Sequence, residues 1–200
     1  MPQIDLRYIK VAKYINNNGT VSYSNKQTAG DAMTAALSLR SAEGRLYAES
    51  ALAEYLKMAT GGSISLGVKY LPDAVQKLMY GMTDKSRSIT YTVGTTEVTE
   101  SVSGLALASE STGSYVGVAF YAPDMVDGVL KYTAMFIPKA LFGPPDHNFQ
   151  TAGDGFNFQT PVTTGEFMRS DDSSHELLEF VTVDTEAAAK AWVDKVLSAT

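Results

Sequence analysis

The stretch that decides the fold is Gly113–Pro161, GSYVGVAFYAPDMVDGVLKYTAMFIPKALFGPPDHNFQTAGDGFNFQTP. Its first part, Tyr115–Tyr121, alternates between two sets of side chains, a period of two that is typical of a β-strand with two distinct faces. Leu130–Ile137 alternates in the same way. The two segments therefore predict a β-hairpin, with Ala122–Gly128 as its turn-rich linker. One face of the first strand carries Val116, Val118 and Phe120.

The second half of this stretch predicts an interruption and a return. Gly143-Pro144-Pro145-Asp146 cannot continue a strand ladder, because proline lacks the N–H donor. The chain then turns back through Phe149–Gln159, with Phe156 and Phe158 on one side. Nothing in the stretch resembles a reaction centre. The stretch instead predicts a sheet with a structural role.

The composition is that of one globular domain spanning residues 1–200. Two hundred residues are enough for a single domain with a real core. Hydrophobic residues make up 44% of the chain, and charged residues only 19%, a balance that favours sheets joined by polar turns. Cysteine is absent, which excludes disulfides and thiolate metal sites. The net charge of −6 argues against general nucleic-acid binding, which needs clustered Lys and Arg.

The N-terminus and the hydropathy pattern predict no membrane anchor. The first ten residues, MPQIDLRYIK, carry charges where a signal peptide needs an apolar core. No apolar run approaches the roughly 18 residues of a membrane span.

Further alternating segments outside the central stretch predict more strands. Residues 1–40 form an N-terminal arm of strands, with a turn at Asn16–Gly19. The polar segment Thr163–Ser174 is interpreted as a loop. The predicted strands are Ile4–Tyr14, Met33–Arg40, Ser63–Val68, Ser88–Val93, Thr96–Val102 and Glu176–Val183.

Residues 41–62, SAEGRLYAESALAEYLKMATGG, break the alternation. Ala51–Met58 has the apolar spacing of a short helix, and the alternative is a long hairpin loop that ends at Gly61-Gly62. A connection of this length without firm structure is usually functional or mobile.

Two helices are predicted. The first spans Pro72–Gly81, because Pro72 suits the first helical position and Gly81 a C-terminal stop. It is a structural helix that buries Val75, Leu78 and Met79 against a sheet. The second spans residues 184–198, is capped by Asp184 or Thr185, and carries Ala189, Trp192, Val193 and Val196 on its apolar side. The fold class is mainly β, a sandwich or barrel with a short flanking helix and a C-terminal helix.

The sequence shows no catalytic, cofactor or metal signature. It contains no GxSxG elbow, no GxxxxGK loop and no HExxH. His147 beside Asp146, and His175 beside Glu176, lack ligand spacing, and the interpretation as solvated loop residues is favoured. We therefore expect no catalytic residues, no cofactor and no metal, and a protein that is not an enzyme.

An ordered set of segments resembles a known family. LYAESALAE (46–54), GGSISLGVKYLPDAVQKLMYG (61–81), SYVGVAFYAP (114–123), GVLKYTAMFIPKALF (128–142), FNFQTPVTTGEFM (156–168) and the closing EAAAKAWVDKV (186–196) follow the order seen in major tail proteins. These are the tail tube proteins of bacteriophages with long non-contractile tails. The resemblance covers most of the chain from about residue 40, and the first forty residues match least.

The resemblance implies a tail-tube β-sandwich that assembles as hexameric rings stacked into a tube. Such a tube conducts the genome from the capsid into the host cell during ejection. The implied partners are further copies of the chain, a tape-measure protein, and tail terminator and tip proteins, with genomic DNA passing through the bore without specific binding. The implied location is the virion tail, assembled in the host bacterial cytoplasm. The rival classes are a monomeric carbohydrate-binding β-sandwich module and a small hydrolase.

Two interfaces are predicted for the tube. The first is edge-to-edge pairing of strands around the ring, because Tyr115–Tyr121 and Leu130–Ile137 contain few charges that would blunt an edge. The second is a ring-to-ring contact made by residues 41–62. These residues mix charged and apolar side chains, which suits an interface that must stay soluble before assembly. The candidate contact residues are Glu43, Arg45, Leu46, Tyr47, Glu49, Leu52, Glu54, Tyr55 and Lys57.

Overall fold

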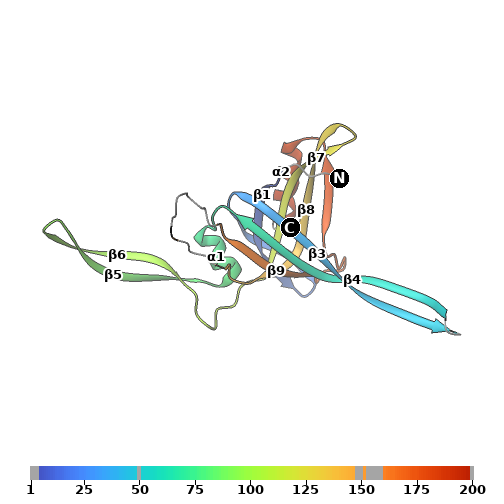
Figure 1. Ribbon diagram of the computed structural model, residues 1–200, viewed down its shortest axis with the longest axis horizontal. Coiled ribbons are helices and arrows are strands. Elements are labelled where there is room, and N and C mark those ends of the chain that lie inside the picture. Colours follow the sequence, from blue (N-terminus) through green and yellow to red (C-terminus); the bar gives the residue numbers. More distant parts are fainter. Residues whose placement is uncertain (1–4, 49–50, 147–150, 152–159, 199–200) are drawn as a thin grey trace.

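The computed structural model describes residues 5–48, 51–146, 151 and 160–198. Within these residues the chain forms antiparallel strands and two helices, shown in Figure 1. In order these are β1 (Arg7–Asn17), β2 (Thr20–Thr28), β3 (Ala32–Ala48), β4 (Ala51–Val68), α1 (Asp73–Tyr80), β5 (Thr83–Val93), β6 (Thr96–Ala106), β7 (Val116–Val126), β8 (Val129–Phe142), β9 (Val162–Met168), β10 (Glu179–Val183) and α2 (Glu186–Val196).

One large antiparallel sheet makes up the body of the molecule. Its strand order is β2-β1-β7-β8-β9-β4-β3, with β10 also paired to β8. The first half of β8 pairs with β10 and the second half with β9, and Pro138 lies between the two. The sheet folds so that buried residues of β4 and β9 pack with those of β1, β7 and β8. The result is the mainly β, sandwich-like architecture that the sequence predicts.

Strand β7 separates two hydrophobic cores. The residues Val116, Val118 and Phe120 enter the core between the two layers of strands. The alternate residues Ala119 and Tyr121 enter a second core beneath α2. Because both faces are covered, nine consecutive residues from Val116 to Asp124 are buried. The period of two that predicts a strand with two distinct faces is confirmed.

The hairpin of β7 and β8 is tighter than its sequence predicts. Residues 122–126 continue strand β7 and pair with β8 as far as Val126 opposite Val129. The turn is only Asp127 and Gly128, with φ of 51° and 78°. These positive values are those of a type I′ hairpin turn, which asparagine, aspartate and glycine favour. The predicted seven-residue linker is therefore wrong, and the break after Phe142 is confirmed.

Helix α1 closes the first core, as predicted. Val75, Leu78 and Met79 are buried there. Gly81 ends the helix in the left-handed region, with its N–H donating to the Lys77 carbonyl. Pro72 is the N-cap rather than the first helical residue, a shift of one position.

Helix α2 covers the outer face of β7 and β8. The Thr185 hydroxyl accepts a hydrogen bond from the Ala188 N–H and caps the helix. Ala189 and Val193 are fully buried, and the Tyr121 hydroxyl donates to Glu186 Oε1 at 2.6 Å. The predicted C-terminal helix is confirmed, two residues shorter at each end.

Three further sequence-based predictions need correction and one lies mostly outside the described residues. Residues 41–62 form no helix. They form a hairpin, as the stated alternative has it, but one of paired strands rather than a loop, because β3 and β4 pair across almost all of them. Thr163–Ser174 is not a loop throughout, since β9 pairs with β4 and β8. Strands β7 and β8 are not sheet edges, since each is paired on both sides. Most of the predicted return through Phe149–Gln159 falls in undescribed residues.

Neither described helix is long and apolar enough to cross a membrane.

Candidate assembly interface

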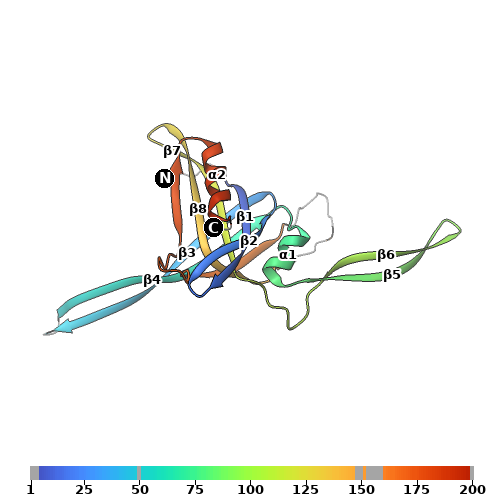
Figure 2. The ribbon, with the colours of Figure 1, turned by 180° about the vertical axis from the view of Figure 1, so that it is seen from behind.

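Two β-ribbons project from the body in opposite directions (Figures 1 and 2). The β3–β4 arm consists of residues 41–48 and 51–59, the outer part of the β3–β4 hairpin. The β5–β6 arm consists of residues 83–106, which form a separate two-stranded sheet. Two-stranded ribbons are only marginally stable in water unless something packs on them. These two arms are therefore the candidate interfaces of the protein.

An irregularity marks the root of the β3–β4 arm. The pairing shifts by one residue between Arg40 opposite Gly61 and Ser41 opposite Ala59, leaving Thr60 as an extra residue. Gly61 has a φ of 147°, and a Cβ there would lie 2.6 Å from the Phe167 carbonyl oxygen. Such a bulge bends a ribbon and increases its twist. Glycine is thus required where the arm leaves the sheet.

One face of the β3–β4 arm carries a charged cluster. Glu43 accepts from Arg45 and Lys57, both at 3.2 Å, and the Arg45 guanidinium lies 5.7 Å from the centre of the Tyr55 ring. The hydrogen bond from Lys57 is the main cause that lowers the pKa of the Glu43 carboxyl. The structure thus brings together four of the nine predicted contact residues: Glu43, Arg45, Tyr55 and Lys57.

The opposite face of this arm is apolar and open to solvent. Leu46 lies on it, opposite Glu54, followed toward the root by Leu56 and Met58. Leu46, Leu56 and Met58 are 57%, 61% and 60% exposed. Sequence reasoning missed Leu56 and Met58 as contact candidates. Their separation by two residues would have indicated a shared face, had the segment been interpreted as a strand.

The remaining predicted contact residues do not all join these faces. Tyr47 is exposed on the charged side of β3, two residues beyond Arg45. Leu52 belongs to β4, but its side chain lies outside the described part of the structure, as does Glu49.

The β5–β6 arm also has two unlike faces. One face is a ladder of hydroxyl groups, in which Ser86 and Ser103 are 3.1 Å apart and Thr90 and Thr99 are 2.8 Å apart. The other face begins near the root with Lys85 and Arg87, carries Glu100 at mid-length, and is otherwise mainly apolar. These apolar residues are Ile89, Tyr91, Val93, Val98 and Val102. All of β5 is exposed, so nothing among the described residues covers this apolar face.

The root of the β5–β6 arm is closely packed on helix α1. A Cβ on Gly113 would lie 1.8 Å from the Met79 carbonyl oxygen, and one on Gly81 would lie 2.4 Å from that of Thr112. The Ser114 N–H donates to the Leu78 carbonyl, and Lys77 pairs with Asp84 at 2.7 Å. The close backbone contacts of Gly81, Gly113 and Ser114 hold the root of the arm on the helix, and the exposed Lys77–Asp84 pair adds little.

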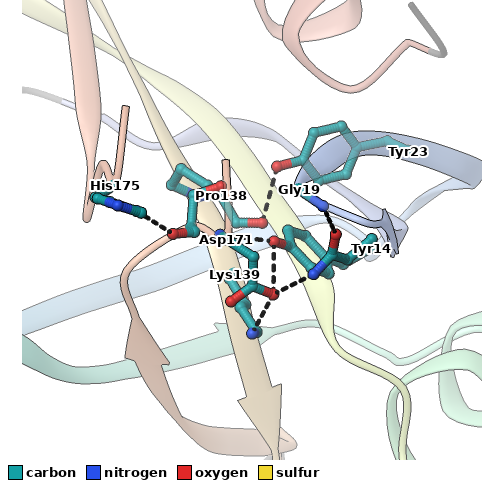
Figure 3. A network of polar contacts seen from close by, with 9 residues as sticks. Tyr14, Gly19, Tyr23, Pro138, Lys139, Asp171 and His175 are labelled. Atoms are coloured by element: carbon teal, nitrogen blue, oxygen red, sulfur yellow. Dashed lines mark hydrogen bonds and ion pairs between the residues drawn. The ribbon is translucent and has the colours of Figure 1, made fainter. Parts of the chain in front are cut away.

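A polar network holds the segment after β9 onto the body (Figure 3). Asp171 Oδ2 accepts hydrogen bonds from Lys139 at 2.7 Å, from the Tyr14 hydroxyl at 3.1 Å and from Asn16 at 3.1 Å. The Lys139 ammonium also lies 4.8 Å from the centre of the Tyr115 ring. The Lys139 side chain is only 13% exposed, so its charge depends on these partners. This network is structural in character.

Replacing Asp171 with Asn is expected to lower the free energy of unfolding at neutral pH by about 1 kcal/mol, since the pair is partly exposed. Hydrogen bonding from Lys139 holds the pKa of the Asp171 carboxyl below its usual range. Its stabilisation is therefore present above the unfolded pKa of about 3.9 and is lost as the pH falls through the folded pKa.

The measurement is urea unfolding of wild type and Asp171→Asn between neutral and acidic pH. The difference between the two should shrink as the pH drops below about 4. Asp184→Asn is the matched control, because Asp184 pairs with Lys131 but its side chain is 83% exposed. Equal stability at neutral pH, or a difference that grows in acid, would contradict this role.

The described residues contain no group of three or more His, Asp or Glu side chains placed to hold a metal ion. His175 sits in a tight turn, with Nδ1 3.3 Å from the Ser170 carbonyl, and His147 lies outside the described residues. A cleft of about 380 Å³ is lined mainly by apolar side chains, among them Leu6, Met33 and Phe120. Asp5, the acidic residue that lines the cleft, forms an ion pair with Arg7 at 2.7 Å. The cleft offers no convergent acid–base groups.

Neither a scan of protein-family models nor a search of curated proteins finds a match for this chain.

Proposed function

We propose that this protein is a structural subunit that assembles with copies of itself into hexameric rings, which stack into the tail tube of a bacteriophage. The observation that carries the proposal is the pair of oppositely directed arms, each with an uncovered apolar face. An isolated monomer gains nothing from such arms, whereas a repeating assembly buries them. The family resemblance of the sequence supplies the particular assembly, a tube that conducts DNA into the host cell.

The edges of the large sheet offer a second contact around the ring. Strands β2 and β3 end the sheet path, and neither has a further described strand on its outer side. Pairing of β2 in one subunit with β3 in the next would join the sheets into a continuous inner barrel and use both edges. These strands replace the ones that the sequence analysis assigned to the edges.

The proposed role needs no active site, and the net charge of −6 fits a conduit for DNA. DNA carries one negative charge per roughly 1.7 Å of its axis, so a bore without basic clusters does not retain it. The alternative, a carbohydrate-binding module, requires exposed aromatic side chains that form one platform. The three most exposed ones instead lie in separate parts of the chain, with Phe180 in β10, Tyr47 in β3 and Tyr70 between β4 and α1.

Analytical ultracentrifugation over a concentration series tests the proposal. Self-assembly predicts a shift from monomers to hexamers or larger species as concentration rises. A strictly monomeric protein at the highest attainable concentration would contradict it. A monomer that also binds immobilised polysaccharide would support the carbohydrate-binding alternative.

A further inference from the structure

The apolar face of the β5–β6 arm has the features of a buried surface, although nothing described in the chain covers it. Val93, near the tip, is 61% exposed, and Ile89 and Tyr91 precede it on the same face. The opposite face is a ladder of serine and threonine hydroxyls that bond to each other across the strands. A ribbon with one apolar and one polar face is suited to packing on one side only.

The β3–β4 arm presents a face of similar character. Leu46, Leu56 and Met58 lie on one side of a ribbon that is itself exposed. The two arms leave the body in opposite directions, so they cannot meet within one chain (Figure 2). We propose that the apolar face of the β5–β6 arm is covered by the apolar face of the β3–β4 arm of a second copy. This inference rests on the proposed self-assembly and specifies which two surfaces meet.

Charges on the two faces give the direction of overlap. Glu54 lies near the tip of the β3–β4 arm, on its apolar face opposite Leu46. Lys85 and Arg87 lie near the root of the β5–β6 arm, on its apolar face. None of these three makes an ion pair with another described residue.

Overlap of the tip of one arm with the root of the other brings the Glu54 carboxylate to these two cations. The reverse overlap, tip on tip, instead places Glu54 against the apolar outer part of the β5–β6 arm, near Tyr91 and Val98 and away from Lys85 and Arg87. A charge held against apolar side chains without a partner is unfavourable. The complementary arrangement is therefore the antiparallel one. It also places Leu56 over Ile89 and Ala42 over Val98, given the pairing within each ribbon.

A contact of this kind is heterologous, because the two surfaces that meet are different. Each copy gives its β3–β4 arm to one neighbour and its β5–β6 arm to another. Such a head-to-tail contact generates a closed ring or an open filament rather than a closed dimer.

Cysteine cross-linking tests the contact directly, because the natural chain contains no cysteine. Ala42→Cys and Val98→Cys are made in separate, differently sized proteins, which are mixed under assembly conditions with a short bismaleimide. The control partner is Thr99→Cys, one residue along on the polar face of the same ribbon. We expect the Ala42→Cys and Val98→Cys mixture to give at least about ten times more cross-linked heterodimer than the control mixture.

Equal cross-linking of both mixtures, with wild-type protein assembling normally, would overturn the arm-to-arm contact and leave the proposed function standing. Wild-type protein that does not assemble at all would overturn the proposed function and this inference with it.

A charge exchange gives an independent readout. Lys85→Glu/Arg87→Glu should lower the assembled fraction about tenfold by facing Glu54 with like charge. Adding Glu54→Arg to the same chain should restore assembly. Glu97→Arg, on the polar face of the arm opposite Thr92, should have no effect. The inference would be overturned if Lys85→Glu/Arg87→Glu assembled as well as wild type. It would also be overturned if adding Glu54→Arg to that variant did not restore assembly.

Discussion

Replacing residues 43–57 with a short Gly/Ser linker is expected to yield a folded protein that no longer self-assembles. The replacement leaves Ala42 paired with Met58 and keeps the arm's root intact. None of the removed residues with described side chains belongs to either hydrophobic core. The ion pairs of Glu43 lie wholly within the removed segment, so no residue of the body loses a partner.

The reason for the expected loss of assembly is the removal of both arm faces together. Leu46 and Leu56 provide most of the apolar area, and Glu54 provides the matching charge. The cost to the monomer is small, because the entropy of closing a loop changes only slowly with its length. The free energy of unfolding should therefore change by less than about 1 kcal/mol.

Sedimentation of the shortened protein, beside urea unfolding, provides the measurement. The expected result is a monomer with a near-normal unfolding midpoint at concentrations where wild type assembles. Oligomers of normal size would show that the contact lies elsewhere, for example at the edges of β2 and β3. The control is Asp127→Asn in the turn of the β7–β8 hairpin, which preserves the turn type and should leave assembly unchanged.

Leu78→Ala is expected to cost about 2–5 kcal/mol of stability, a large share of a domain's total. Leu78 is 6% exposed and belongs to the core between the sheet layers. Its carbonyl also accepts the Ser114 N–H, so the helix and the segment returning from the β5–β6 arm share this position. Truncation of the side chain leaves a cavity where α1 meets the sheet.

Lys77→Ala is the matched control on the same helix. Lys77 pairs with Asp84, but its side chain is 38% exposed, and a partly exposed ion pair contributes less than about 1 kcal/mol. Denaturation midpoints for both variants, together with an assembly assay, distinguish a role of α1 in core packing from a role in contacts between subunits. A small shift for Leu78→Ala combined with loss of assembly for Lys77→Ala would make α1 an interface element and contradict its structural role.

The sequence predicts most elements that bury a face and also the exposed β5–β6 hairpin, but it fails for the β3–β4 arm. Val116, Val118 and Phe120 alternate because one side of β7 enters a core, and this side is found where the pattern predicts it. Helix α1 has a defined start at Pro72 and end at Gly81, and these residues act through their own backbone geometry. Such signals are local, so they can be identified without knowledge of the fold.

The β3–β4 arm could not be predicted in the same way. Residues 46–58, LYAESALAEYLKM, are rich in Ala, Leu, Glu and Lys, all of which favour helices. Neither face of this ribbon enters a core, and the alternation within this segment, Leu56 and Met58 on either side of Lys57, is too short to oppose that preference. Long-range pairing of β3 with β4 overrides it. For β9 the alternate buried residues include Thr163 and Gly165, which are too polar or too small to indicate a core-facing strand.

Which strands lie at the sheet edge also could not be predicted. Alternation reports the two faces of a strand, and carries no information on its neighbours within the sheet. The few charged residues in β7 and β8 had suggested that these strands are exposed sheet edges. They are few because α2 and the opposite layer bury both strands.

Electron microscopy of the purified, concentrated wild-type protein in negative stain tests the central claim most directly. Self-assembly through the arms predicts rings with sixfold symmetry, or tubes built by stacking them, and predicts their absence for the protein shortened at residues 43–57. Uniform particles of monomer size in both samples, under conditions in which each is folded, would contradict the account.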